Sequence, residues 1–143
     1  MRVVSCNSFG PIEQLVVEER PSVPVPPGCV RIEVKAAGVN FVDALVVQGL
    51  YPIKPPTPFV PGDEVAGVVS ECGEGVTSHR VGDRVFASTG LGGFATEVVV
   101  PASRAIATPS VLTDGQAATF VQSYGTAWFA LHRRAREIGR AHV

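Results

Sequence analysis

Glycine and proline interrupt this chain so often that long regular elements have little room. There are 15 glycines and 12 prolines among 143 residues, and the stretches between them are short and rich in Val, Ile and Ala. Short apolar runs bounded by turn residues are typical of β-strands. Two proline clusters, at 21–27 and 52–61, cannot donate ladder hydrogen bonds at their prolines and are expected to be surface loops. The sequence therefore predicts a mainly β domain.

The clearest strand is predicted over 29–37, where apolar and charged residues alternate. Val30 and Ile32 fall on one face of this segment, whereas Arg31 and Glu33 fall on the other. The apolar face needs a second sheet to cover it. Further strands are predicted over 2–6, 14–19, 64–72, 84–87, 94–100 and 104–107.

Helical signals are few and mostly late in the chain. A short helix is expected over 41–48, following Asn40 as its N-cap. Thr113 and Gln116 form a capping-box pattern that predicts a helix reaching Val121. A further helix is expected from 123 to 136, with an apolar face formed by Ala127, Trp128 and Leu131.

Composition and charge narrow the classes of function. Twelve basic against thirteen acidic residues leave a formal charge of -1, so nucleic acid is not an expected partner. The amino terminus has neither the apolar segment of a signal peptide nor a membrane span, which favours a cytoplasmic protein without a membrane partner. Three widely spaced cysteines do not make a disulfide framework.

Several ordered blocks resemble one enzyme superfamily. They are Ala-Gly-Val-Asn-Phe-Val-Asp at 37–43, Gly-Leu-Tyr-Pro at 49–52, the segment 58–69 that contains Pro-Gly-Asp-Glu, Val-Gly-Asp-Arg-Val at 81–85, Gly-Gly-Phe-Ala-Thr-Glu at 92–97 and Tyr-Gly-Thr-Ala-Trp at 124–128. In this order and spacing they closely resemble the medium-chain dehydrogenase/reductase superfamily, and most closely its zinc-free NADPH:quinone oxidoreductase branch, the zeta-crystallin-like family.

The resemblance implies a domain organisation. Residues 1–122 are expected to form a GroES-like β-barrel catalytic domain with short helices, and 123–136 to begin the helix that leads to a Rossmann domain absent from this chain. That domain would bind NADPH or NADH. The nearest glycine cluster, at 90–93, has no helix after it and is expected to be a loop.

The tail at 137–143 departs from the family pattern. Its reverse translation from Ile138 onward can be written as the sequence of a common short-read sequencing adapter. The hypothesis is that this tail is not native and that the chain is an amino-terminal fragment of a longer enzyme. The parent enzyme is expected to be a homo-oligomer.

The residue types at two positions favour the zinc-free branch. Zinc alcohol dehydrogenases carry a Cys where this chain has Asn40 and a His where it has Asp63, so both ligand types are missing here. His79 and His132 lie outside any ligand pattern and are expected to be surface histidines. Without zinc, the implied chemistry is hydride transfer from the nicotinamide to a quinone or an α,β-unsaturated carbonyl compound.

Four residues are the candidate site. The resemblance implies that Asn40, Asp43 and Tyr51 are catalytic, and that Asn40 and Thr126 lie near the cofactor. Each also has a structural explanation: Asn40 as an N-cap, Asp43 as a first-turn carboxylate, Tyr51 packed on Pro52 and Thr126 as a helix spacer. Leu45 stands where several quinone reductases have a second tyrosine, which leaves the acceptor open.

Two alternatives remain at this point. One is a stand-alone GroES-like binding module, which would show a complete barrel with a proper terminal strand. The other is an enoyl-thioester reductase of the same superfamily, which the leucine at position 45 allows.

Overall fold

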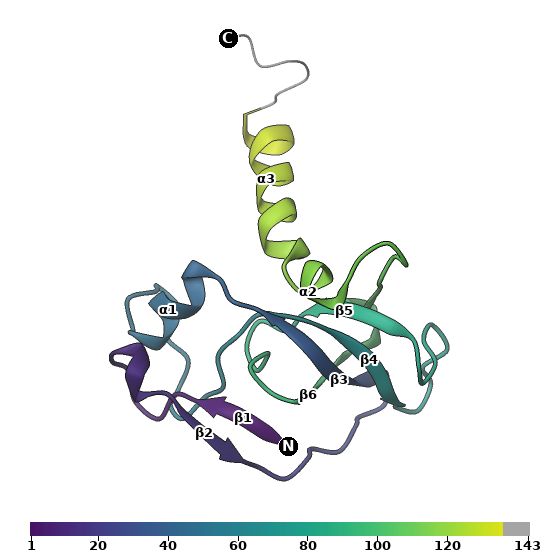
Figure 1. Ribbon diagram of the computed structural model, residues 1–143, viewed down its shortest axis with the longest axis horizontal. Helices are drawn as coiled ribbons and strands as arrows, with labels where there is room; N and C mark the ends of the chain where they lie inside the picture. Colours follow the sequence, from purple (N-terminus) through teal and green to yellow (C-terminus); the bar gives the residue numbers. More distant parts are fainter. Residues whose placement is uncertain (136–143) are drawn as a thin grey trace.

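The computed structural model describes residues 1–135 and shows the expected mainly β architecture (Figure 1). A five-stranded sheet has the order β6-β3-β4-β5-β7, and β1 and β2 form a separate two-stranded sheet. Every strand pair named in the two sheets is antiparallel. The strands are β1 (Arg2–Ser5), β2 (Val16–Glu19), β3 (Cys29–Gly38), β4 (Glu64–Cys72), β5 (Arg84–Ser88), β6 (Glu97–Pro101) and β7 (Ile106–Ala107).

β3 is an interior strand of the five-stranded sheet, and its alternating sequence suits this position. It pairs with β4 on one side and with β6 on the other. Val30 and Ile32 are fully buried, whereas Glu33 and Lys35 are exposed, as the alternation predicted. The main core gathers valines from the neighbouring strands around this face: Val65, Val69, Val85, Val98 and Val100.

Two predicted strands begin later than expected because a proline starts a turn in front of each. Gln14 lies in the 3₁₀ turn η1 (Ile12–Gln14), where its N–H donates to Pro11 O at 3.0 Å. Pro101 likewise precedes η2 (Ala102–Arg104), so β7 starts at Ile106 rather than at Arg104. Proline favours the first position of such turns, which the strand pattern alone did not reveal.

The third late start, at β6, has a different cause. β6 begins at Glu97, whereas 94–96 was expected to be strand as well. The Phe94 N–H donates to Pro61 O at 2.9 Å, and the Phe94 carbonyl accepts the Val4 N–H at 2.8 Å. These main-chain groups therefore connect β1 to the loop before β4 and do not extend the sheet.

The helices agree with the predictions in type but differ in their bounds. α1 spans Phe41–Val47, and α2 spans only Asp114–Ala117, with the expected capping box between Thr113 and Gln116. α2 stops early where Ala117 and its neighbour Ala118 are buried against the barrel. A continuous helical segment follows, formed by η3 (Val121–Gly125), α3 (Thr126–Trp128) and η4 (Phe129–Arg134).

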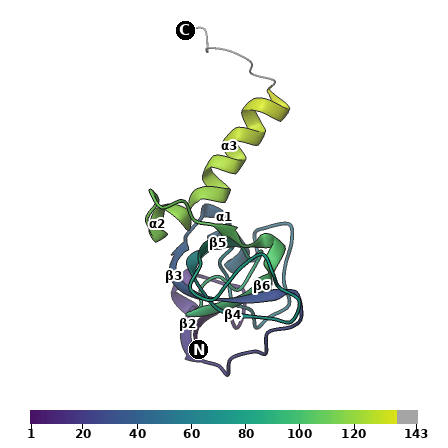
Figure 2. The same cartoon turned by 90° about the vertical axis from the view of Figure 1, so that its right-hand side faces the viewer.

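This last helical segment extends away from the barrel in both views (Figures 1 and 2). The apolar face predicted for it is exposed: Trp128 is 54% and Leu131 is 51% exposed. Sequence periodicity correctly indicated this helix. No helix in residues 1–135 is long and apolar enough to cross a bilayer.

The predicted domain boundary at 122 remains a prediction. Position 136 and the proposed non-native tail at 137–143 lie outside the described residues.

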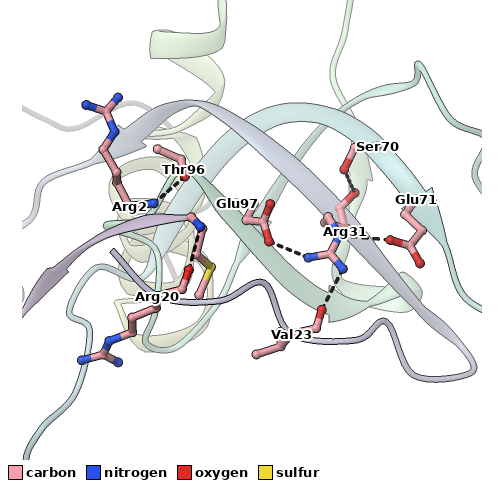
Figure 3. A network of polar contacts seen from close by, with 9 residues as sticks. Arg2, Arg20, Val23, Arg31, Ser70, Glu71, Thr96 and Glu97 are labelled. Atoms are coloured by element: carbon pink, nitrogen blue, oxygen red, sulfur yellow. Dashed lines mark hydrogen bonds and ion pairs between the residues drawn. The ribbon is translucent and has the colours of Figure 1, made fainter. Parts of the chain in front are cut away.

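An ionic network, here called the Arg31 network, fastens the first proline loop to the sheet (Figure 3). The Arg31 guanidinium donates to Glu97 at 2.6 Å, to Glu71 at 3.1 Å and to the Val23 carbonyl at 2.7 Å. Its side chain is only 13% exposed. The network therefore joins three strands and the loop at 21–27 through one cation.

Candidate functional site

A cleft of about 510 Å³ opens beside α1. Its walls come from α1, the second proline loop, the loop after β5 and the start of the projecting helix. The apolar wall consists of Val42, Val46, Ile53, Pro55, Pro61 and Leu91. The polar wall consists of Asp43, Tyr51, Asp63, Thr89, Gly90 and Gln122.

α1 begins at the edge of this cleft because Asn40 ends the extended chain after β3. Asn40 has extended backbone angles (φ -116°, ψ 156°), and its N–H donates to Asp43 Oδ2 at 2.7 Å. The Asn40 side-chain oxygen faces the Asp43 N–H in a capping-box arrangement that falls short of hydrogen-bond geometry. Its amide nitrogen donates to Glu64 Oε2 at 3.0 Å. Asn40 is thus the predicted N-cap, and its amide is also part of a wider polar cluster.

Gly62 fixes the direction of the chain as it enters β4. Its φ is +94°, and a Cβ there would lie 2.5 Å from Phe94 Cδ1, so only glycine fits. The next residue, Asp63, then accepts three hydrogen bonds. They come from Ser88 Oγ at 2.7 Å, from the Gly90 N–H at 2.6 Å and from Gln122 Nε2 at 2.7 Å.

Glu64 is the first residue of β4 and is only 1% exposed. Its Oε1 accepts the Gln122 main-chain N–H at 2.7 Å, and its Oε2 accepts the Asn40 amide. Gln122 is therefore held by its main chain and by its side chain, which fixes the start of the projecting helix to the cleft. Sequence reasoning missed Gln122 because its partners are 58 and 59 residues away and no local pattern marks it.

Asp43, Asp63 and Glu64 form a carboxylate cluster that has only neutral donors. Their hydrogen-bond donors are amides, a hydroxyl and main-chain N–H groups. No Lys, Arg or His lines the cleft in the part of the chain that the structure describes. Asp43 is 8% exposed. Its burial, together with the charges of Asp63 and Glu64, raises the pKa of its carboxyl, while main-chain hydrogen bonds from Asn40 and Gly62 oppose that rise.

The structure brings three of the four candidate residues together. Asp43 and Tyr51 line the cleft, and Asn40 lies directly behind Asp43. Tyr51 is placed there by Gly49, whose φ of +68° ends the helical turn after α1. Thr126 is exposed on the projecting helix and does not line the cleft.

The arrangement of possible metal ligands bears on the chemistry of the cleft. Within residues 1–135, no group of three or more His, Cys, Asp or Glu side chains is arranged to hold a metal ion. His79 differs from the expected surface histidine. It is half-buried, and its Nε2 lies 3.1 Å from the Ala102 carbonyl oxygen. His132 is exposed, as expected, with its ring 5.4 Å from that of Trp128.

Comparison with known proteins identifies the domain. The sequence profile of the alcohol dehydrogenase GroES-like domain matches residues 26–110, which is more than half of the chain. The chain belongs to the alcohol dehydrogenase GroES-like domain family. The GroES-like fold expected from the sequence blocks is thereby confirmed, and the matched region contains the cleft residues from Asn40 to Leu91.

Relatives of this GroES-like domain include proteins named as oxidoreductases. The chain is 43% identical to the quinone oxidoreductase-like protein 2 homolog of Nematostella vectensis, over 94% of this chain and 37% of that protein. It is 38% identical to the synaptic vesicle membrane protein VAT-1 homolog of Rattus norvegicus, over 92% of this chain and 33% of that protein. The chain thus spans about a third of the length of these curated relatives.

A solved structure also resembles this chain over part of its length. The crystal structure of Escherichia coli quinone oxidoreductase complexed with NADPH is similar with a TM-score of 0.86 and 31% identity. The match covers 96% of this chain and 42% of that chain. This GroES-like chain therefore corresponds to less than half of that enzyme.

Proposed function

We propose that this chain is the substrate-side half of an NAD(P)H-dependent oxidoreductase that transfers hydride to a quinone or an α,β-unsaturated carbonyl compound without zinc. The observation that carries the proposal is the cleft, where Asp43 and Tyr51 face an apolar wall and Asn40 lies behind them. Family membership and relatives named as quinone oxidoreductases support it.

Residues 1–135 do not form a site for the phosphates of a nicotinamide nucleotide. A dinucleotide site needs a parallel strand-helix-strand unit with a glycine-rich turn, and the strand pairs of residues 1–135 are antiparallel. The phosphates would therefore be held by another part of the protein. A bound reduced nicotinamide supplies hydride.

The cleft residues have distinct parts in this proposal. The apolar wall holds the body of the acceptor and excludes water from it. The Tyr51 phenol donates a hydrogen bond to the acceptor carbonyl oxygen as negative charge develops there. Asn40, oriented by Glu64, lies behind Asp43, and the buried Asp43 carboxyl can hold a proton near the reacting carbon.

The first experiment tests the reaction class. The genomic locus is sequenced past codon 143, the complete reading frame is expressed, and oxidation of NADPH and NADH is followed with menadione and benzylideneacetone. Turnover by protein free of bound metal, measured by elemental analysis, is the expected result. Turnover that requires added zinc and is lost with a chelator would contradict the proposal. The 143-residue chain alone is expected to show no turnover.

A second experiment tests the site. In the complete protein, Tyr51→Phe removes one hydrogen bond to the acceptor and should lower kcat/KM about tenfold. Tyr124→Phe makes the same change at the other tyrosine of the chain, 65% exposed on the projecting helix, and should leave kcat/KM unchanged. If both substitutions changed kcat/KM equally, the result would argue against binding of the acceptor in the cleft beside Tyr51.

A further inference from the structure

The cleft has an unusual charge distribution for a site that binds carbonyl compounds. Carboxylates supply two of its lining residues, Asp43 and Asp63, and the buried Glu64 lies next to them. Lys54 sits in sequence between two lining residues of the proline loop, but it is exposed and does not line the cleft. The lining that this chain supplies therefore combines carboxylates with apolar side chains.

We propose that Asp63 determines the charge of the acceptor, so that the cleft admits neutral carbonyl compounds with apolar bodies and excludes anionic ones. This inference rests on the proposed function and adds a substrate class to it. The excluded compounds include those that carry a free carboxylate close to the reacting carbonyl.

The geometry of Asp63 gives it this role. Ser88, Gly90 and Gln122 donate to its two oxygens from three directions, so the carboxylate is held at the cleft wall. Each donor is a neutral group and leaves the negative charge without a counter-ion. An anion entering the cleft would lose water and approach a fixed like charge, which is unfavourable in partly enclosed surroundings.

The apolar residues of the lining favour an apolar body. Ile53 is 73% and Leu91 is 41% exposed, and both line the cleft. Covering these side chains with an apolar ligand removes them from water, which favours binding. Charge exclusion and apolar attraction thus act on different ends of the same ligand.

The test compares three probes on the 143-residue chain by NMR titration of the Thr89, Gly90 and Leu91 amide signals at neutral pH. The probes are benzylideneacetone, benzylidenepyruvamide and benzylidenepyruvate; the last two are matched in size and differ in the charge of the group bonded to the reacting carbonyl. The carboxylate should bind at least about tenfold more weakly than the carboxamide, as expected for an added like-charge contact.

Two variants test the role of charge separately. Asp63→Asn removes the negative charge and should raise the affinity for the carboxylate about threefold to tenfold, with the carboxamide unchanged. Leu91→Lys adds a cation at an exposed position of the cleft without removing any hydrogen bond of Asp63. Because Leu91 belongs to the apolar wall, this change should weaken binding of the carboxamide, and it should raise the affinity for the carboxylate relative to that for the carboxamide. Glu19→Gln, on β2 away from the cleft lining, is the control and should change neither affinity.

The outcomes separate the two proposals. Equal affinity of the wild-type chain for carboxamide and carboxylate would overturn charge selection and leave the proposed function standing. If Asp63→Asn raised the affinity for the carboxamide and the carboxylate equally, charge selection by Asp63 would also be overturned and the proposed function would stand. If none of the three probes shifts the cleft signals, the cleft is not an acceptor site, and the proposed function fails together with this inference.

Discussion

The Arg31 network and the carboxylate cluster are both polar, yet they balance charge in opposite ways. In the Arg31 network, Glu97 and Glu71 each face the same guanidinium, and one cation serves two carboxylates and a carbonyl. In the carboxylate cluster, Asp43, Asp63 and Glu64 face only neutral donors. The difference is that the Arg31 network offsets its negative charges with a cation, whereas the carboxylate cluster leaves negative charge beside the cleft, which makes this cluster a candidate for function.

The largest effect is expected from Glu64→Ala, which would break the cluster. It leaves the Gln122 N–H and the Asn40 amide without their acceptor in a buried place, and should lower the free energy of unfolding by about 3 kcal/mol. Urea unfolding of the chain measures this. Glu33→Ala removes an exposed carboxylate paired with Lys35 and should cost less than about 0.5 kcal/mol. Similar losses for both variants would show that burial does not distinguish the two carboxylates.

Arg31→Met should come next, because it breaks the other network. It keeps the apolar stem and removes three hydrogen bonds, so a loss of about 1–2 kcal/mol is expected. Added salt should reduce the difference in the free energy of unfolding between Arg31→Met and the wild type, because salt screens ion pairs. The control is Arg20→Met, whose pair with Glu18 is about a third exposed and should contribute under about 1 kcal/mol. If the difference in the free energy of unfolding between Arg31→Met and the wild type did not change with salt, the Arg31 network would not stabilise the fold through its charges.

A smaller effect is expected from Gln122→Met. This substitution removes only the side-chain hydrogen bond to Asp63, so the free energy of unfolding should fall by about 1 kcal/mol. The main-chain hydrogen bond to Glu64 remains. Hydrogen exchange should therefore show the Gln122 N–H still protected. Gln48→Met removes an exposed amide bond to the Ala44 carbonyl and serves as the control. Loss of protection at position 122 would show that the side chain, and not Glu64, holds the helix.

The smallest effect is a change in pH dependence at Asp43. Its raised pKa means that the folded chain binds this proton more tightly than the unfolded chain does. The free energy of unfolding should therefore fall as pH rises from the ordinary value of 3.8 through the raised folded-state pKa. Asp43→Asn should flatten that fall, whereas Asp83→Asn, in a turn where the carboxylate accepts the Arg80 N–H, should not. If the free energy of unfolding fell more steeply with pH in Asp43→Asn than in the wild type, the pKa of Asp43 would be lowered in the folded chain and not raised.

The strands were largely predictable because their side chains alternate between core and solvent over several residues. The bounds of β4 agree with the prediction, and those of β3 differ by one residue. The errors arose where a main-chain group bonds outside the ladder, as at Phe94, or where a proline starts a turn, as at Pro101. Such hydrogen-bond partners leave no periodic trace in the sequence.

The site was predictable only in part. Asn40, Asp43 and Tyr51 lie within short blocks, and the structure brings them to one cleft edge, while their catalytic roles remain a prediction. Glu64 stood in a recognised block, but its role depends on Gln122, which comes 58 residues later. The apolar face of the projecting helix was predicted from its periodicity, but periodicity does not indicate which surface covers such a face.

The bond between Glu64 and position 122 has a consequence for how this region can evolve. Because the donor is the peptide nitrogen, any residue except proline can stand at position 122 without releasing the helix. The side chain there can then change while the backbone stays tethered. Divergent members could retune the chemistry of the cleft wall at this one codon without first acquiring a compensating substitution elsewhere.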